Sequence, residues 1–106
     1  MRNEDGLRES AIEGYLVQQV ALHLRGEAKK FAGYRGWPDR IVVLPCGITD
    51  WVECKRPKGG RFEPLQERCH ARLQRMGHKV FVILTRTQVD AYIDDARRRI
   101  SAIQSL

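Results

Sequence analysis

The chain of 106 residues is long enough for one domain, spanning residues 1–106, and too short for two. Its 19 Lys and Arg residues exceed its 13 Asp and Glu residues and leave a net charge of +6, which suits a polyanionic partner such as nucleic acid but equally serves solubility. The sequence has no apolar leader and no run of about 18 apolar residues, so we expect a cytoplasmic protein without a membrane span. Three cysteines without C-x-x-C spacing are expected to be reduced thiols.

The first predicted element is a helix over residues 10–25. Ser10 and Glu13 have the spacing of a capping box, and Gly26 is the expected stop. Apolar residues recur along this segment at helical intervals: Ile12, Leu16, Val20 and Leu24. Residues 30–35 are expected to form a short strand that ends at a Gly-Trp-Pro turn.

The middle of the chain predicts a β-hairpin. Residues 40–44 are β-branched and apolar, a Pro-Cys-Gly turn follows, and residues 49–55 supply the second strand. Pro64 then begins a helix that Gly77 closes. The apolar stripe of this helix is Leu65, Cys69, Leu73 and Met76.

The last third of the chain predicts a strand and a helix. Residues 79–85 are apolar enough for a strand covered on both faces, and Thr87 is the expected cap of a helix that ends near residue 103. The buried stripe of this helix is expected to be Val89, Ile93, Ala96, Ile100 and Ile103. The order helix, three strands, helix, strand, helix favours an α/β fold with a mixed sheet flanked by helices.

Charged residues gather at the open end of the predicted hairpin. Because side chains alternate along a strand, Glu53 and Lys55 share one face, and Asp39 falls opposite them. Two carboxylates can hold Mg²⁺, which assists phosphodiester hydrolysis by polarising the phosphate, while an adjacent ammonium can act on the water. The alternative is that Asp39 caps the turn after Pro38 and that Glu53 and Lys55 form an exposed ladder. The main-chain carbonyl of Cys54 is a candidate third ligand.

Glu13 gives an independent indication. At about 100° per residue, its carboxylate points to the same side of the helix as Leu16 and Val20, which is the inward side. A capping box with Ser10 explains this placement in one way. Otherwise the carboxylate needs a cation nearby, which a metal centre or Lys55 would provide.

Four motifs in order resemble the PD-(D/E)xK nucleases, and most of all the VRR-NUC family, which includes small stand-alone phage proteins. The motifs are Glu13, Gly36-Trp37-Pro38-Asp39, Glu53-Cys54-Lys55 and Gln66, and the resemblance spans residues 10–84. It implies a restriction-endonuclease-like core and a Mg²⁺ or Mn²⁺ ion near Asp39, Glu53 and Glu13, with Glu13 directly at the ion or reaching it through a water. It also implies a catalytic Lys55 and a supporting Gln66.

Basic side chains flank the predicted centre and are expected to contact DNA phosphates. They are Lys29, Arg35, Arg56, Lys58, Arg61, Arg68 and Arg72. For the helical arginines, a solvated face is an equal alternative. Trp37 and Trp51 are candidates for stacking on bases, or for packing in the core. The three histidines lack the spacing of a histidine metal site.

We therefore expect a metal-dependent endonuclease that cuts DNA according to its structure. The resemblance to small stand-alone members suggests a Holliday junction resolvase acting as a homodimer, within the host cell cytoplasm if the protein is phage-encoded. The competing hypothesis is a non-catalytic nucleic-acid-binding module on the same fold. Intact Asp39, Glu53 and Lys55 argue against that module, because inward carboxylates repel phosphate unless a metal is present.

Overall fold

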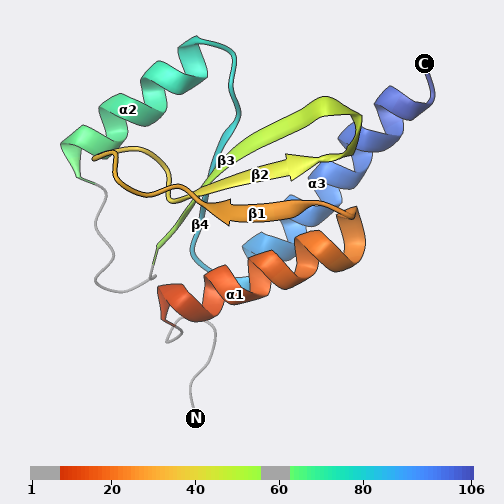
Figure 1. The fold of residues 1–106 in the computed structure, drawn as a ribbon, viewed down its shortest axis with the longest axis horizontal. Coiled ribbons are helices and arrows are strands. Elements are labelled where there is room, and N and C mark those ends of the chain that lie inside the picture. Colours follow the sequence, from red (N-terminus) through yellow and green to blue (C-terminus); the bar gives the residue numbers. More distant parts are fainter. Residues whose placement is uncertain (1–7, 56–62) are drawn as a thin grey trace.

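The computed structural model describes residues 8–55 and 63–106, which form a mixed sheet flanked by helices (Figure 1). Along the chain, the elements are α1 (Glu9–Gln19), the π-helix η2 (Val20–Leu24), β1 (Glu27–Lys30), β2 (Arg40–Leu44), the 3-10 turn η3 (Pro45–Gly47), β3 (Ile48–Cys54), α2 (Pro64–Arg75), β4 (Val80–Ile83) and α3 (Arg86–Gln104). The predicted order of elements is confirmed.

The four strands lie in the order β1-β2-β3-β4. β1, β2 and β3 pair antiparallel, and β4 adds to β3 in parallel after the crossover through α2. The hairpin of β2 and β3 closes at Leu44 and Ile48, with the predicted Pro-Cys-Gly turn between them. Within that turn Cys46 has a φ of 66°, a left-handed conformation that is uncommon for a residue other than glycine.

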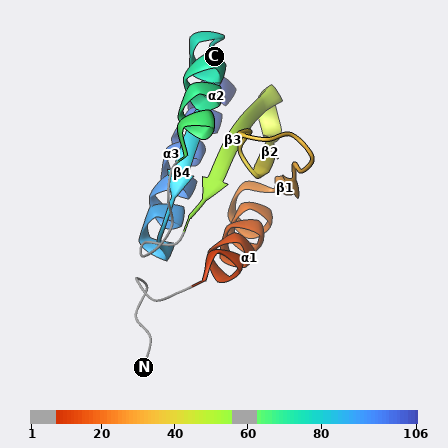
Figure 2. The same ribbon diagram turned by 90° about the vertical axis from the view of Figure 1, so that its left-hand side faces the viewer.

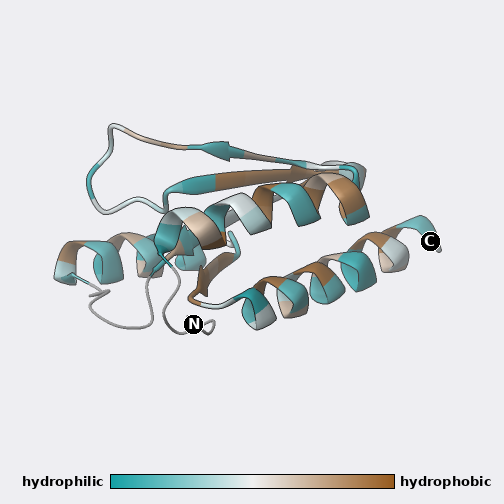
Figure 3. Ribbon diagram, turned by 90° about the horizontal axis from the view of Figure 1, so that it is seen from below, coloured by the Kyte–Doolittle hydropathy of each residue, from teal (hydrophilic) through white to brown (hydrophobic). Residues whose placement is uncertain are grey.

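The alternation of side chains along the hairpin divides the core between two faces. Val52 and Cys54 on β3 face the cluster formed with α1 and α3, whereas Trp51 faces the cluster formed with α2. Figure 2 shows α1 and α2 set apart, and Figure 3 shows hydrophobic stretches along α1 and α3 where they approach each other and the sheet.

The first helix differs from the sequence-based expectation at both ends. Its N-cap is Arg8, with no side-chain cap, so Ser10 lies inside the first turn and forms no capping box. At the other end, five residues are π-helical and Arg25 takes the left-handed conformation expected of a glycine. Gly26 is needed for a different reason, because a Cβ there would lie 2.7 Å from the carbonyl oxygen of Val43. The predicted apolar stripe is confirmed as buried.

The first strand was predicted too late in the chain. It begins directly after the helix, at Glu27, and residues 31–39 form the connection to β2. Gly33 and Gly36, with φ values of 96° and 84°, interrupt any extended strand in this segment. The aromatic residues that suggested a strand instead pack on one another in the loop.

The last strand and helix also need corrections. Val82 on β4 is 38% exposed, so this strand is not covered on both faces. Thr85, rather than Thr87, caps α3: its Oγ1 accepts a hydrogen bond from the Gln88 amide, at 3.1 Å. Two predicted stripe residues are exposed, Met76 beyond the end of α2 and Ile103 near the end of α3. None of the helices within residues 8–55 and 63–106 is long and apolar enough to cross a membrane.

Candidate active site

The open end of the β2–β3 hairpin brings together the three charged residues expected there. Arg40 pairs with Val52, so Asp39 falls beside the end of β3, and its Oδ1 accepts a hydrogen bond from the Cys54 amide at 3.4 Å. Asp39 therefore joins two strands and does not cap the turn after Pro38. In Figure 1 this end of the sheet is the left-hand end, near the first turn of α1.

Glu53 lies near the end of β3, with only 4% of its surface exposed. Lys55 Nζ is 3.7 Å from Glu53 Oε2, and the side chain of Lys55 is itself only 15% exposed. This burial excludes the exposed ladder considered as an alternative. The second oxygen, Oε1, accepts no hydrogen bond among the described residues, although His70 Nε2 lies 4.0 Å away.

Burial and neighbouring negative charges raise the cost of ionising both carboxyl groups at this end. Burial, followed by the nearby charge of Glu13, raises the pKa of Asp39 to about 6. Burial, followed by the charge of Asp39, raises the pKa of Glu53 to about 7, against the lowering effect of Lys55. A divalent cation between these carboxylates would favour their charged forms.

Glu13 is held by a cation that the sequence reasoning did not identify. Arg40 Nε donates to Glu13 Oε1 at 2.9 Å, and both side chains are mostly buried. Arg40 Nη1 also donates to the carbonyl oxygen of Ala28, at 3.3 Å. The inward glutamate thus has Arg40 as its partner, instead of a capping interaction with Ser10 or an ion pair with Lys55. A lone arginine at the start of an apolar strand was the available signal.

The first turns of α2 close the same end of the site. Gln66 Oε1 accepts a hydrogen bond from the Glu63 amide at 3.1 Å, and the Glu63 side chain caps the Gln66 amide in return. Gln66 therefore serves a capping box in this structure. One turn later, His70 is 5% exposed, and burial, then Lys55, lowers its pKa. The sequence places His70 next to Cys69 of the apolar stripe, but no local pattern in it indicates that His70 lies near Glu53.

The expected DNA contacts are only partly placed. Arg56, Lys58 and Arg61 lie outside the described residues. Among the others, Arg35, Arg68 and Arg72 are exposed, and Lys29 makes an exposed ion pair with Glu27 at 3.3 Å. The two tryptophans pack against each other, with ring centroids 5.3 Å apart, and Trp51 is buried. Trp51 is therefore a core residue and offers no face to a base.

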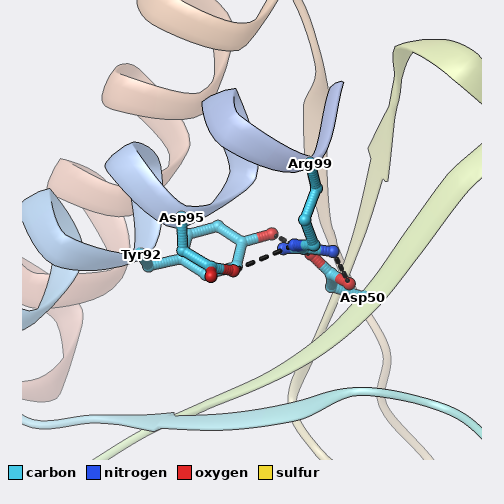
Figure 4. Close-up of polar contacts among 4 residues, drawn as sticks. All are labelled: Asp50, Tyr92, Asp95 and Arg99. Carbon is cyan, nitrogen blue, oxygen red and sulfur yellow. Dashed lines mark hydrogen bonds and ion pairs between the residues drawn. The ribbon is translucent and has the colours of Figure 1, made fainter. Parts of the chain in front are cut away.

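A second polar cluster lies away from this site and fixes α3 to β3 (Figure 4). Arg99 donates from Nη1 and Nη2 to the two oxygens of Asp50, at 2.9 and 2.7 Å, and the Tyr92 hydroxyl donates to Oδ2 at 2.6 Å. Arg99 Nε also donates to Asp95 Oδ2, one helical turn earlier, at 2.9 Å. Asp50 was missed, although a carboxylate flanked by apolar residues in a strand was a signal of a buried partner.

The donor set at the hairpin end fits a hard cation better than a soft one. Within the two described ranges, no group of three or more Asp, Glu, His and Cys side chains is arranged to hold a metal ion by itself. Asp39 and Glu53 supply two carboxylates, and Mg²⁺ commonly takes one or two of these with water and phosphate oxygens. The unbonded, buried Oε1 of Glu53 is the feature that a cation would satisfy.

Comparisons with known proteins show which family the chain resembles. The chain is 48% identical over 79 residues to "Putative nuclease p44" of Acyrthosiphon pisum secondary endosymbiont phage 1, a match that covers 73% of this chain and 83% of that protein. A solved VRR_NUC domain superposes with a TM-score of 0.75 at 33% identity, covering 81% of this chain and 94% of the domain. No family model matches the sequence.

The fold and the hairpin site define a nuclease domain with a restriction-endonuclease-like core. The chain belongs to the VRR-NUC family, as a small nuclease of the phage type.

Proposed function

We propose that this nuclease is a Mg²⁺- or Mn²⁺-dependent endonuclease that hydrolyses phosphodiester bonds in DNA. The observation that carries the proposal is the convergence of the buried Glu53 carboxylate and the half-buried Asp39 carboxylate, both of raised pKa, with the Lys55 ammonium at one end of the hairpin. Burying a charge without a partner is costly, so carboxylates gathered in this way are better explained by a bound cation than by a structural role alone. The name "Putative nuclease p44" of the phage relative supports the nuclease part of this proposal.

Asp39, Glu53 and the main-chain carbonyl of Cys54 would hold the ion, with Glu13 nearby. When bound, the ion would polarise the phosphoryl oxygens and make a bound water a better nucleophile. The role of Lys55 is to orient that water or to offset the charge that develops on the phosphate. Cys54 and Arg40 have positioning roles, because the Cys54 amide holds Asp39 and the Arg40 guanidinium holds Glu13.

The proposed substrate is branched DNA, with the Holliday junction as the first candidate. A domain of this size has little surface for reading a long sequence, so recognition of shape is the simpler route. Two symmetric cuts at a junction would suit a homodimer. The exposure of Ile103 and Leu106 on and after α3 leaves apolar surface for such a contact. Equilibrium sedimentation tests the dimer directly.

The decisive assay measures cleavage of labelled junction, flap and linear duplex DNA in Mg²⁺, in Mn²⁺ and in EDTA. We expect cleavage only with metal, and a loss of at least about 100-fold for Asp39→Asn and for Lys55→Ala, because each removes a group that acts on the reacting phosphate. Undiminished cutting by both variants would remove the site from consideration.

Two matched substitutions control for charge and for folding. Asp94→Asn and Lys79→Ala remove one carboxylate and one ammonium from exposed positions away from the hairpin end, and both should cut at the rate of the unmodified protein. Thermal melting of each variant shows whether a loss of cutting reflects unfolding. Metal-independent binding of junctions without any cutting would favour a non-catalytic binding module.

A further inference from the structure

The loop between β1 and β2 presents one exposed aromatic ring, which is supported by the partly buried rings of Phe31 and Trp37 and the buried ring of Trp51. Tyr34 is 64% exposed, and its ring stacks on Phe31 with centroids 5.3 Å apart and planes inclined by 20°. Phe31 in turn packs edge-on against Trp51, at 4.9 Å, and beside Trp37, at 5.5 Å. An aromatic ring held flat on a rigid support, with its other face uncovered, has the form of a stacking platform.

Backbone contacts fix the loop that carries this ring. The Trp37 amide donates to the Tyr34 carbonyl at 3.3 Å, and the Phe31 amide donates to the Asp39 carbonyl at 2.9 Å. Gly36 lies against the first turn of α2, where a Cβ would come within 3.0 Å of the carbonyl oxygen of Leu65. Figure 1 shows this loop reaching toward the start of α2. The ring is thus held in place before any ligand arrives, which lowers the entropy cost of binding.

The platform stands next to the proposed catalytic centre. Trp51, which supports it, and Glu53 are two residues apart on the same face of β3, a separation of about 7 Å. The same loop ends at Asp39, whose carbonyl oxygen accepts a hydrogen bond from the Phe31 amide. Arg35, beside Tyr34, is exposed and can meet a phosphate of the same strand.

We propose that Tyr34 stacks on an unpaired nucleobase next to the scissile phosphate, and so selects DNA with a single-stranded or branched segment over continuous duplex. The proposal rests on the nuclease function proposed above, and it names the feature of branched DNA that this chain reads. A base inside a continuous duplex is already stacked on its neighbours and offers no free face. An unpaired base offers its face to Tyr34, whatever its identity, so the selection is by structure and not by sequence.

The test compares binding of a forked duplex and of a blunt duplex of the same sequence, in EDTA so that cleavage plays no part. The fork carries 2-aminopurine at each of its first four unpaired positions in turn. We expect one position at which binding quenches the fluorophore, and we expect Tyr34→Ala to abolish the quenching and weaken fork binding between about 5-fold and about 150-fold. Tyr34→Phe should retain both properties, because stacking requires the ring and not the hydroxyl.

Arg35→Ala is the matched control on the neighbouring residue. It removes a charge instead of a ring, so it should weaken fork and duplex equally and leave the quenching in place. Fork binding by Tyr34→Ala at the unmodified affinity, or equal losses on fork and duplex, would overturn the proposal. If Tyr34→Phe melts normally but loses quenching as completely as Tyr34→Ala, stacking is also refuted.

The outcome is separable from that of the nuclease assay. A protein that shows Tyr34-dependent quenching but never cuts DNA would refute the hydrolytic function and support the platform. A protein that cuts branched DNA in Mg²⁺ but shows no difference between the Tyr34 variants would support the hydrolytic function and refute the platform. Melting curves of Tyr34→Ala show whether Phe31, once uncovered, still holds the loop.

Discussion

At the scale of single residues, the open end of the hairpin brings together the carboxyl groups of Asp39 and Glu53, which the described cations beside them do not fully neutralise. Within residues 8–55 and 63–106, the Lys55 ammonium lies 3.7 Å from Glu53 Oε2, while Arg40 is engaged by Glu13. Both carboxyl groups have raised pKa values, first because of burial and then because of a neighbouring carboxylate, Glu13 for Asp39 and Asp39 for Glu53. The site therefore costs stability when no cation is bound, which is the usual relation between function and stability at a prepared site.

Asp39→Asn should stabilise the metal-free protein at pH 8 by about 1–2 kcal/mol, after allowing for solvent screening. The folded protein holds the Asp39 proton up to a pKa of about 6, against about 4 in the unfolded chain, so the free energy of unfolding falls as the pH rises through this window. The advantage of the variant should therefore shrink at pH 5.5. Urea unfolding in EDTA at both pH values measures it.

His70 also contributes to the pH dependence of the free energy of unfolding, and the comparison of the two proteins removes most of this contribution. Burial and Lys55 lower the pKa of His70, so its protonation costs stability as the pH falls below about 6.5. Because His70 is present in both proteins, the difference between variant and unmodified protein removes most of this effect. Asp94→Asn, at an exposed position on α3, should show no such pH-dependent gain. An equal gain for Asp94→Asn would mean that the effect is one of net charge.

Sequence alone predicted the positions of Asp39, Glu53 and Lys55 because their meeting depends on local rules. Strand alternation and a short turn determine which hairpin residues lie opposite one another. Arg40 and His70 could not be placed in this way. Arg40 contacts Glu13, which lies 27 residues earlier in the chain. His70 lies near Glu53 but belongs to α2, which follows residues 56–62 in the sequence. Such pairs depend on how elements pack, which no local pattern specifies.

At the scale of elements, α3 is tied to β3 by a buried ion pair and not by apolar packing alone. Asp50 is 1% exposed and takes three hydrogen bonds, two from Arg99 and one from Tyr92 (Figure 4). Burial raises the pKa of Tyr92, and so does the negative Asp50 carboxylate, which accepts the hydrogen bond of the Tyr92 hydroxyl. A paired buried charge of this kind is costly to break from one side only.

Arg99→Met should lower the free energy of unfolding by about 3–5 kcal/mol, because it leaves the Asp50 carboxylate buried without its cation. The double variant Asp50→Leu/Arg99→Met should recover most of this loss, since no charge then remains buried. Chemical denaturation of the two proteins measures both values. Asp95→Asn is the matched control: it removes a partner of the same arginine that is 41% exposed, and should cost less than about 1 kcal/mol. A double variant as unstable as Arg99→Met would show that shape, and not charge, governs this contact.

The element boundaries show where local sequence rules mislead. Ser10 and Thr87 both have capping chemistry, yet each lies inside the first turn of its helix, because the chain enters the helix two residues earlier than the pattern indicates. Thr85 has an extended backbone and Gln88 accepts from the Leu84 amide at 2.6 Å, so a complete cap exists two residues upstream of Thr87. Apolar periodicity, which depends on many residues, predicted the helices well. Single capping residues predicted their ends poorly.

At the scale of the whole molecule, the sheet separates two sets of exposed arginines. Arg68 and Arg72 lie on α2, which packs on the same face of the sheet as the aromatic loop and Trp51. Arg97 and Arg98 lie on α3, which packs on the opposite face with α1. If DNA lies across the hairpin end and the aromatic loop, only the α2 set can reach its phosphates, although both sets contribute equally to the net charge.

The salt dependence of DNA binding distinguishes contact from net charge. Each phosphate contact that is lost should reduce the slope of log affinity against log salt concentration by about 0.9 on duplex DNA. Arg68→Gln/Arg72→Gln should therefore lower the slope by up to about 1.8, whereas Arg97→Gln/Arg98→Gln, with the same change of net charge, should leave it unchanged. Fluorescence anisotropy of a labelled junction at salt concentrations from 50 to 200 mM, about the range over which this term dominates, measures both slopes. Equal reductions for the two double variants would mean that the overall field of the protein, and not the α2 face, attracts the DNA.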